Sequence, residues 1–174
     1  MAVELVLGDI VDMTTDAIAT SAHSDLRPMP GINAQIFKRA NTEQLLATCK
    51  RIGSCRIGQA VVTASYGLPC KYIIHVVGPG WYSGHKNERL LFANCYRRAL
   101  EKALAYQCES VALPLMFSGA YHVPRAQALQ IVCREIHAFE QQHPTLRIVL
   151  VLYKESIYRL AEQTYRTLLE DQLV

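Results

Sequence analysis

Short runs rich in β-branched and aliphatic residues alternate with longer segments of helical periodicity, and this alternation limits the possible fold more than any other feature of the sequence. The candidate strands are Val3 to Leu7, Ala17 to Ser21, Ala60 to Ala64, Tyr72 to Val77, Ser110 to Leu115 and Leu146 to Tyr153. The last run, LRIVLVLY, is apolar nearly throughout, which is typical of a strand covered on both faces. The alternation therefore predicts a layered α/β domain with this last run near the centre of the sheet.

Apolar residues at spacings of three and four predict the helices. Leu90 to Tyr106 and Ala126 to Phe139 each place one apolar stripe against the sheet. Pro124 is expected at the start of the second helix, because proline is well tolerated in a first turn. A final helix from Ser156 to Leu169 is predicted to begin with Ser156 as its cap.

The size and composition of the chain fit one domain spanning residues 1–174. With 51% hydrophobic and 19% charged residues, the chain can bury a substantial core, and a net charge of +3 is too small for a histone-like role. No apolar run approaches the roughly 20 residues of a membrane helix. Glu4 and Asp9 lie near the start, where a signal peptide is uncharged. We therefore expect a cytoplasmic protein with no membrane partner.

The cysteines are scattered without a C-x-x-C pair, so we expect reduced, mostly buried thiols. Cys133 and His137 would share a helix face, but two ligands do not make a metal site, and the prediction is no metal and no cofactor. Nothing in the spacing of Cys55 or Cys70 supports a catalytic thiol. His75 lies inside a predicted strand, where we expect its ring to find a core partner.

Three segments connect a strand-like run to a helix-like one: Gly8 to Ile10, Met29 to Asn33 and Phe117 to Tyr121. Ligands of layered α/β domains bind at such junctions. The third segment, which follows VALPL and precedes Pro124, suits a phosphate, although it also fits an ordinary tight turn. The irregular stretch Gly78 to Glu88 contains Trp81 and Tyr82, which could stack bases or anchor the loop.

Three ordered blocks of sequence resemble the macrodomain family over most of the chain. The blocks are VELVLGDIVDMTTDAIATSAHS, CKRIGSCRIGQAVVTASYGLPCKYIIHVVGP and ALPLMFSGAYHVP. The resemblance implies a three-layer α/β/α sandwich around a central mixed, mostly parallel sheet. It also implies that ADP-ribose or a related adenine nucleotide, free or attached to protein, binds above the strand ends.

The resemblance assigns the adenine end of the cleft to Asp9, Ile10 and Tyr153. Asp9 would accept a hydrogen bond from the adenine amino group, which is favourable because a carboxylate forms a charge-assisted bond. Ile10 and Tyr153 would pack against the ring. The residues alone also allow Asp9 to be a turn or capping aspartate and Tyr153 to be an aromatic that covers the core.

The resemblance also assigns the phosphate and ribose end. The loop over the diphosphate would be formed by Phe117, Ser118, Gly119, Ala120, Tyr121 and His122, with Tyr121 closing the cleft. Gly31 and Ile32 would form the opposite wall. Pro30 interrupts the run of glycines that the family has there and removes one backbone donor.

Three departures concern catalysis and the loop. Hydrolytic members have an asparagine where this chain has His23, and many have an acidic residue where it has Asn33. An amide cannot act as a general base, whereas His23 could act as one or could simply cap the strand end. His122 replaces a glycine, so its Cβ is expected to crowd the ligand or to forbid a positive φ, although a protonated ring could instead contact a phosphate.

These observations leave three functional hypotheses. The leading one is an ADP-ribose-binding module with an altered catalytic corner. The alternative is a hydrolase that removes ADP-ribose from protein or the acetyl group from O-acetyl-ADP-ribose, with His23 and Asn33 as its candidate catalytic residues. The third is a nucleic-acid module for RNA or poly(ADP-ribose), based on the basic residues Lys38, Arg39, Lys50, Arg51 and Arg56. An ordinary solvated helix face explains the same basic residues.

Overall fold

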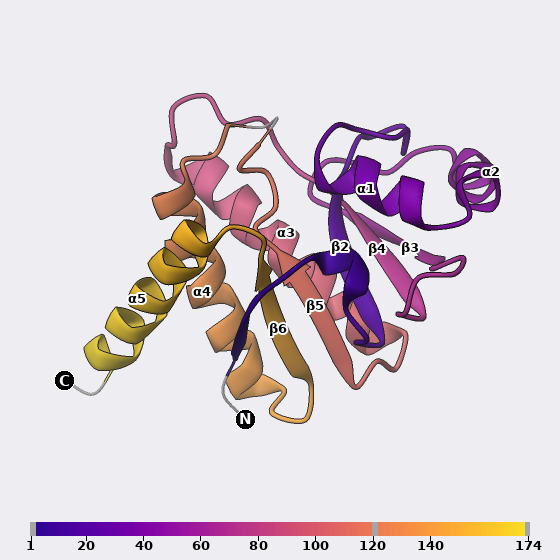
Figure 1. Ribbon diagram of the computed structural model, residues 1–174. Helices are drawn as coiled ribbons and strands as arrows, with labels where there is room; N and C mark the ends of the chain where they lie inside the picture. Colours follow the sequence, from indigo (N-terminus) through magenta and orange to yellow (C-terminus); the bar gives the residue numbers. More distant parts are fainter. Residues whose placement is uncertain (1–2, 120–121, 173–174) are drawn as a thin grey trace.

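A mixed β-sheet lies at the centre of the computed structural model, which describes residues 3–119 and 122–172 (Figure 1). Within these residues the sheet has the order β1 (Glu4–Leu7), β6 (Arg147–Leu152), β5 (Ser110–Pro114), β2 (Ala17–Ala22), β4 (Tyr72–Val77) and β3 (Ala60–Ala64). All neighbouring pairs are parallel except β3 with β4. The predicted strands and the inner position of the last one are confirmed.

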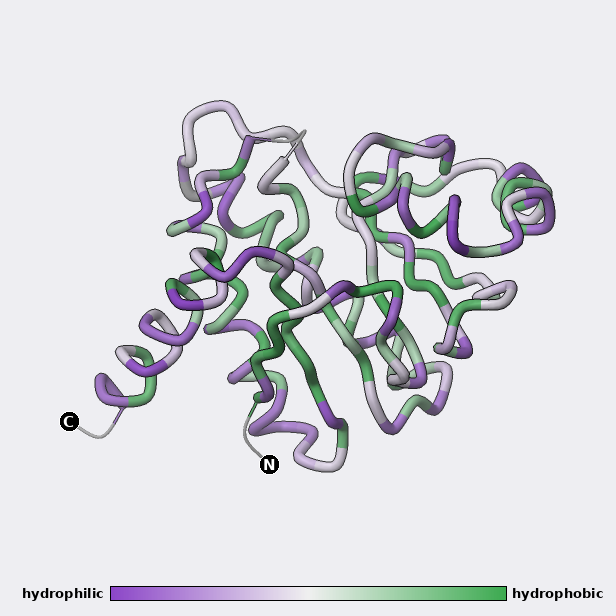
Figure 2. The backbone as a smooth tube through the Cα atoms, viewed as in Figure 1, coloured by the Kyte–Doolittle hydropathy of each residue, from purple (hydrophilic) through white to green (hydrophobic). Residues whose placement is uncertain are grey.

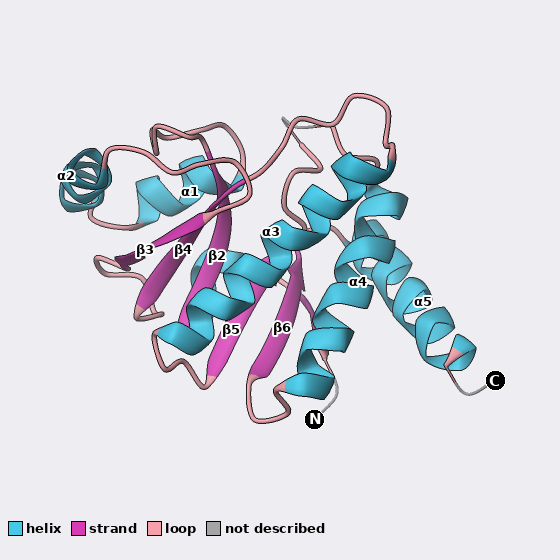
Figure 3. Cartoon of the chain, turned by 180° about the vertical axis from the view of Figure 1, so that it is seen from behind, coloured by secondary structure: helices cyan, strands magenta, loops and turns pink. Residues whose placement is uncertain are grey.

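Helices cover both faces of the sheet. One face packs against α3 (Lys86–Ala105), α4 (Arg125–Gln142) and α5 (Glu155–Asp171), and Figure 3 shows α4 between the other two. The other face packs against α1 (Ile32–Arg39) and α2 (Thr42–Ile52). The predicted three-layer α/β/α arrangement is therefore confirmed.

The pleat of the strands divides the apolar residues between two core clusters. In β5 and β6, Leu113 and Leu150 pack under α3 to α5, while Ala112 and Val149 face the side of α1 and α2. All four side chains are fully buried, and Figure 2 shows hydrophobic colour along the middle of these strands. Strands buried on both faces need no polar alternation, which explains runs such as LRIVLVLY.

Three helices begin earlier than predicted, α4 by one residue, at Arg125 rather than Ala126. α3 begins at Lys86 rather than Leu90, and α5 begins at Glu155 with Lys154 as its N-cap, so the prediction of a Ser156 cap was wrong. β6 ends at Leu152, which leaves only two residues to connect it to α5. Pro124 is the N-cap of α4, directly before the first helical residue, close to its predicted position.

The early start of α3 is linked to the closure of the preceding loop. The carboxylate of Glu88, in the first turn of α3, accepts hydrogen bonds from the backbone N–H groups of Tyr82, Ser83 and Gly84. Burial alone would raise the pKa of Glu88, but these three donors outweigh it and lower the pKa. Trp81 packs edge-on against Phe92 at 6.3 Å, which supports its interpretation as an anchor.

The side chain of Tyr82 is 90% exposed and therefore has no anchoring role.

The cysteines and two histidines are core residues. All six cysteines are free and buried, and burial raises the pKa of Cys70 to about 11, which opposes thiolate chemistry. His75 Nε2 lies 2.9 Å from Thr63 Oγ1, so the expected core partner is present. His137 bonds to side chains on α5 and just beyond it. Within residues 3–119 and 122–172, no group of three potential ligands could hold a metal, and no helix is long and apolar enough to span a membrane.

Candidate functional site

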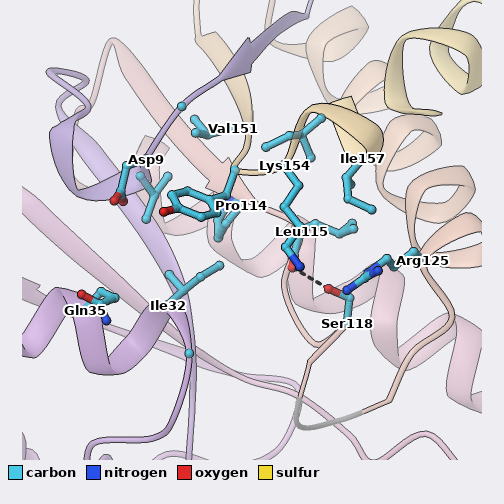
Figure 4. Close-up of a pocket in the computed structure, with 15 residues that line it drawn as sticks. Asp9, Ile32, Gln35, Pro114, Leu115, Ser118, Arg125, Val151, Lys154 and Ile157 are labelled. Carbon is cyan, nitrogen blue, oxygen red and sulfur yellow. Dashed lines mark hydrogen bonds between the residues drawn. The ribbon is translucent and has the colours of Figure 1, made fainter. Parts of the chain in front are cut away.

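A cleft of about 510 Å³ lies where the carboxyl ends of the parallel strands meet (Figure 4). Loops after β1, β2, β5 and β6 contribute to it, as expected for a ligand site in a sheet covered by helices. Its lining residues are Gly8, Asp9, Ile10, Gly31, Ile32, Gln35, Pro114, Leu115, Ser118, Arg125, Val151, Leu152, Tyr153, Lys154 and Ile157.

Asp9 lines the cleft and also caps the short helix η1 (Ile10–Asp12). Its Oδ1 accepts a hydrogen bond from the Val11 N–H at 3.1 Å. Within the part of the chain that the structure describes, Oδ2 has no hydrogen-bond partner. Capping and ligand binding are therefore compatible, because the cap orients the carboxylate and leaves one oxygen for a donor. Ile10 is buried beside it and lines the same cleft.

Tyr153 follows β6 directly and is 75% exposed while lining the cleft. An aromatic ring that covered the core would be largely buried, so that interpretation of Tyr153 was wrong. An exposed aromatic face at the rim of an apolar cleft is instead suited to contact a planar ring.

Gly31 and Ile32, at the start of α1, both line the cleft. Gly31 is the N-cap of α1 and has φ of 90°, a conformation that favours glycine. A Cβ at Gly31 would meet no atom within 4 Å, so the space above it is open. Pro30, which precedes it, is exposed and does not line the cleft.

The loop after β5 contributes Ser118 to the cleft. The Ser118 hydroxyl donates to the Leu115 carbonyl at 3.3 Å, and the His122 N–H donates to the Gly119 carbonyl at 3.0 Å. Among the described residues of this loop, neither Gly119 nor His122 lines the cleft. Ala120 and Tyr121 lie outside the described residues.

Two residues of this loop, Phe117 and His122, have a positive φ, 66° and 58°, without being glycine. The expectation that a side chain at position 122 forbids a positive φ is therefore wrong, because exposed His122 adopts this conformation, at a cost of about 1–2 kcal/mol. The Phe117 ring is 3% exposed and packs edge-on against Phe92 at 5.8 Å. Phe117 therefore supports the loop from the core and does not present its side chain to the cleft.

Neither candidate catalytic residue lines the cleft. His23 follows β2 directly, and its Nδ1 lies 2.7 Å from Asp25 Oδ1. Asn33 is buried, its Nδ2 donates to the Ser21 carbonyl at 3.1 Å, and its Oδ1 accepts from the Met29 N–H at 2.8 Å. The amide of Asn33 thus ties the loop before α1 to β2.

Sequence reasoning missed Arg125 and Lys154, which both line the cleft. Each stands where a helix begins at the strand ends, Arg125 as the first residue of α4 and Lys154 as the N-cap of α5. Long side chains at those positions can reach the cleft, so helix starts placed one or two residues earlier would have pointed to them.

The basic residues behind the nucleic-acid hypothesis lie outside the cleft lining, and two of them have polar partners. Arg39 pairs with Asp12 at 2.8 Å, and Arg51 donates to Thr48 Oγ1 at 3.2 Å. The ion pair with Asp12 reduces the charge that Arg39 offers to a polyanion, and nucleic-acid binding stays a prediction.

Comparison with known proteins agrees with this geometry. The Macro domain family matches residues 19–132. A Macro domain-containing protein of Methanosarcina mazei is 40% identical over 149 residues, covering 85% of this chain and 79% of that protein. An O-acetyl-ADP-ribose deacetylase of Klebsiella pneumoniae is 34% identical over 170 residues, covering 93% and 97%. The solved Oceanobacillus iheyensis macrodomain with ADP has a TM-score of 0.89 at 30% identity, covering 96% of this chain and 91% of that one. The chain belongs to the Macro domain family.

Proposed function

We propose that this protein binds ADP-ribose, free or attached to a protein, in the cleft at the strand ends. The observation that supports this most directly is the pairing of Asp9 and Tyr153 in one cleft. The free carboxylate oxygen of Asp9 accepts a hydrogen bond from the exocyclic amine of adenine, and the exposed Tyr153 ring contacts the base. Related macrodomains solved with ADP support the same ligand class.

Backbone donors on the two walls serve the diphosphate. Among the described residues, the N–H group of Ser118, which lines the cleft, has no acceptor. Gly31 leaves open space above the start of α1, so a phosphate can approach the backbone closely. The cleft volume of about 510 Å³ lies in the usual range for nucleotide-sized ligands.

The proposal is tested by calorimetric titration with ADP-ribose, ADP and AMP at two salt concentrations. Asp9→Asn keeps an oxygen for the η1 cap but places an amide donor opposite the adenine amine, so we expect about 10- to 100-fold weaker binding of all three. Asp12→Asn is the matched control, because Asp12 is exposed, pairs with Arg39 and does not line the cleft. Equal affinity of Asp9→Asn and the parent protein would refute the adenine assignment.

A second candidate function is hydrolysis of O-acetyl-ADP-ribose or of protein-linked ADP-ribose. It is favoured by the identity to relatives named O-acetyl-ADP-ribose deacetylase and by the ring of His23, which Asp25 orients. In this proposal the catalytic corner is altered, with His23 as the base and Asn33 holding the adjacent loop. Turnover of both substrates is measured for the parent, His23→Ala and Asn33→Ala. Full activity in both variants would contradict these roles.

A further inference from the structure

Gln35 is a cleft residue that the proposed contacts to adenine and diphosphate do not use. It lines the cavity together with Asp9 and Ile32. Figure 4 shows Gln35 and Asp9 on the same side of that cavity, away from Ser118. Gln35 comes three positions after Ile32 in α1, so both side chains project from one face of the helix. That face therefore borders the end of the cleft to which adenine is assigned.

The packing of α1 beside η1 places Gln35 at the level of Asp9. An ion pair marks the alignment of the two elements, because Arg39, the last residue of α1, donates to Asp12 Oδ1 at 2.8 Å, and Asp12 is the last residue of η1. Gln35 lies one helical turn before Arg39, nearer the start of α1, which borders the cleft. Asp9 lies at the start of η1 in the same way. The two residues are therefore neighbours at the cleft end of this pair of helices.

The side-chain amide of Gln35 is available to a ligand. Within residues 3–119 and 122–172, neither its Nε2 nor its Oε1 has a hydrogen-bond partner. Asp9 Oδ2 is free in the same part of the chain. The two groups differ in chemistry, because an ionised carboxylate only accepts hydrogen bonds, whereas an amide also donates them. Together they offer a ligand both an acceptor and a donor.

The edge of adenine that carries the amine requires both kinds of group. The amine donates, and the ring nitrogens N1 and N7 on either side of it accept. Asp9 can serve only the amine, and the backbone N–H of Ile10, which has no acceptor among the described residues, can serve one ring nitrogen. At this end of the described cleft, Gln35 supplies a side-chain donor for the other nitrogen. Glutamine is a well-matched partner, since its amide pairs with adenine in proteins that read DNA.

We propose that Gln35 is a specificity residue of the cleft, whose amide donates a hydrogen bond to a ring nitrogen of adenine next to the amine that Asp9 binds. The inference rests on the proposed nucleotide function of the cleft. A single hydrogen bond to the amine would let the base turn about that bond. A second hydrogen bond to a neighbouring ring nitrogen fixes the orientation of the base and restricts the cleft to bases that have an acceptor there.

The test is a calorimetric titration of ADP, 1-deaza-ADP and 7-deaza-ADP, because each analogue replaces one of the two ring nitrogens by C–H. The parent protein should bind the analogue that lacks the nitrogen bound by Gln35 about 5-fold or more weakly than ADP. Gln35→Met keeps the length of the side chain but removes the amide, so ADP should bind about 5-fold more weakly and this ratio should fall to about one.

Gln44→Met is the matched control, because Gln44 is exposed on α2 and does not line the cleft. This variant should keep both the ADP affinity and the ratio of the parent protein. Thermal unfolding of each variant confirms that it folds. Loss of the ratio for one analogue in Gln35→Met, but not in Gln44→Met, supports the inference and identifies the nitrogen.

The other outcomes separate this inference from the proposed function. ADP binding that is indifferent to both deaza replacements overturns the inference and leaves adenine-nucleotide binding intact. Equal weakening of ADP and both analogues in Gln35→Met also overturns it, because the side chain then acts only through the shape of the cleft. If the parent protein binds neither ADP nor ADP-ribose, the proposed function is overturned and this inference with it.

Discussion

Substitution of Gly78 by alanine tests how the core supports the cleft. Gly78 follows β4, and a Cβ there would lie 2.3 Å from Phe117 Cε1 and 2.5 Å from Cζ, inside the 3.0 Å that real Cβ contacts respect. Gly78 does not have the positive φ that would strain an alanine backbone, so the ring contact alone decides the outcome. Because the Phe117 ring is buried against Phe92, the loop that begins at Phe117 has to move.

The expected cost of Gly78→Ala follows from overpacking. An added methyl group in a packed core costs about 1–3 kcal/mol, and the smaller entropy of the unfolded alanine chain returns about 0.4–1 kcal/mol. The midpoints of these ranges leave a net loss of about 1.3 kcal/mol, which for a chain of this length lowers Tm by about 3–5 °C. ADP-ribose affinity falls as well, although Gly78 does not line the cleft, because Ser118 moves with Phe117.

The assay is thermal unfolding followed by circular dichroism, with calorimetric titration of ADP-ribose. Gly119→Ala is the matched control, because its Cβ would meet nothing within 4 Å and its Tm should stay within about 2 °C of the parent value. In a Phe117→Leu background, Gly78→Ala should cost little. An unchanged Tm, or an equal cost in both backgrounds, would refute the reasoning.

Three further substitutions test other parts of the structure. His122→Gly relieves about 1–2 kcal/mol of left-handed strain against about 0.5–1 kcal/mol of added unfolded-state entropy. The denaturant midpoint should therefore rise, and a fall would contradict the strain. Asn33→Asp removes the amide donor to the Ser21 carbonyl and buries a charge, so we expect a loss of about 1–3 kcal/mol in urea unfolding at pH 7; unchanged stability would contradict the tether. Burial lowers the pKa of His75 from 6.5 to about 4, so only the unfolded chain takes up this proton between those values. The contribution of His75 to the free energy of unfolding is therefore fully present above pH 6.5, and the free energy of unfolding decreases by about 3 kcal/mol as pH falls toward 4. His75→Gln should flatten that profile, and an equal slope in the variant would assign it to other groups.

The strands could be predicted because burial on both faces leaves a clear sequence pattern. The run at Arg147–Leu152 is apolar after its first residue and lies between two parallel strands. The helix starts were harder to predict, because they depend on contacts that the spacing of apolar residues does not reflect. α3 starts at Lys86 since Glu88 binds backbone N–H groups of the preceding loop, and no pattern of apolar residues signals that interaction.

The contrast between strands, which leave a sequence pattern, and helix starts and loops, which do not, also explains which cleft residues were predicted. Asp9 and Tyr153 lie one or two residues beyond the ends of β1 and β6, so their positions follow from the sheet, and both line the cleft. Phe117 was assigned to the ligand, yet its ring turns into the core, because a side-chain direction in an irregular loop depends on backbone angles such as its φ of 66°. Arg125 and Lys154 were missed because their reach depends on where α4 and α5 begin.

The departures from the family pattern affect backbone and side-chain chemistry differently. Pro30 leaves Gly31 as the N-cap of α1 at φ of 90°, and His122 keeps a left-handed conformation without a glycine. His23 and Asn33 instead change the functional groups themselves, and Asn33 uses both ends of its amide to hold the loop. Diphosphate binding depends on backbone donors, whereas hydrolysis depends on a side-chain base. We therefore expect ADP-ribose binding to persist even where turnover is lost, and comparing affinity with turnover on the same preparation separates the two.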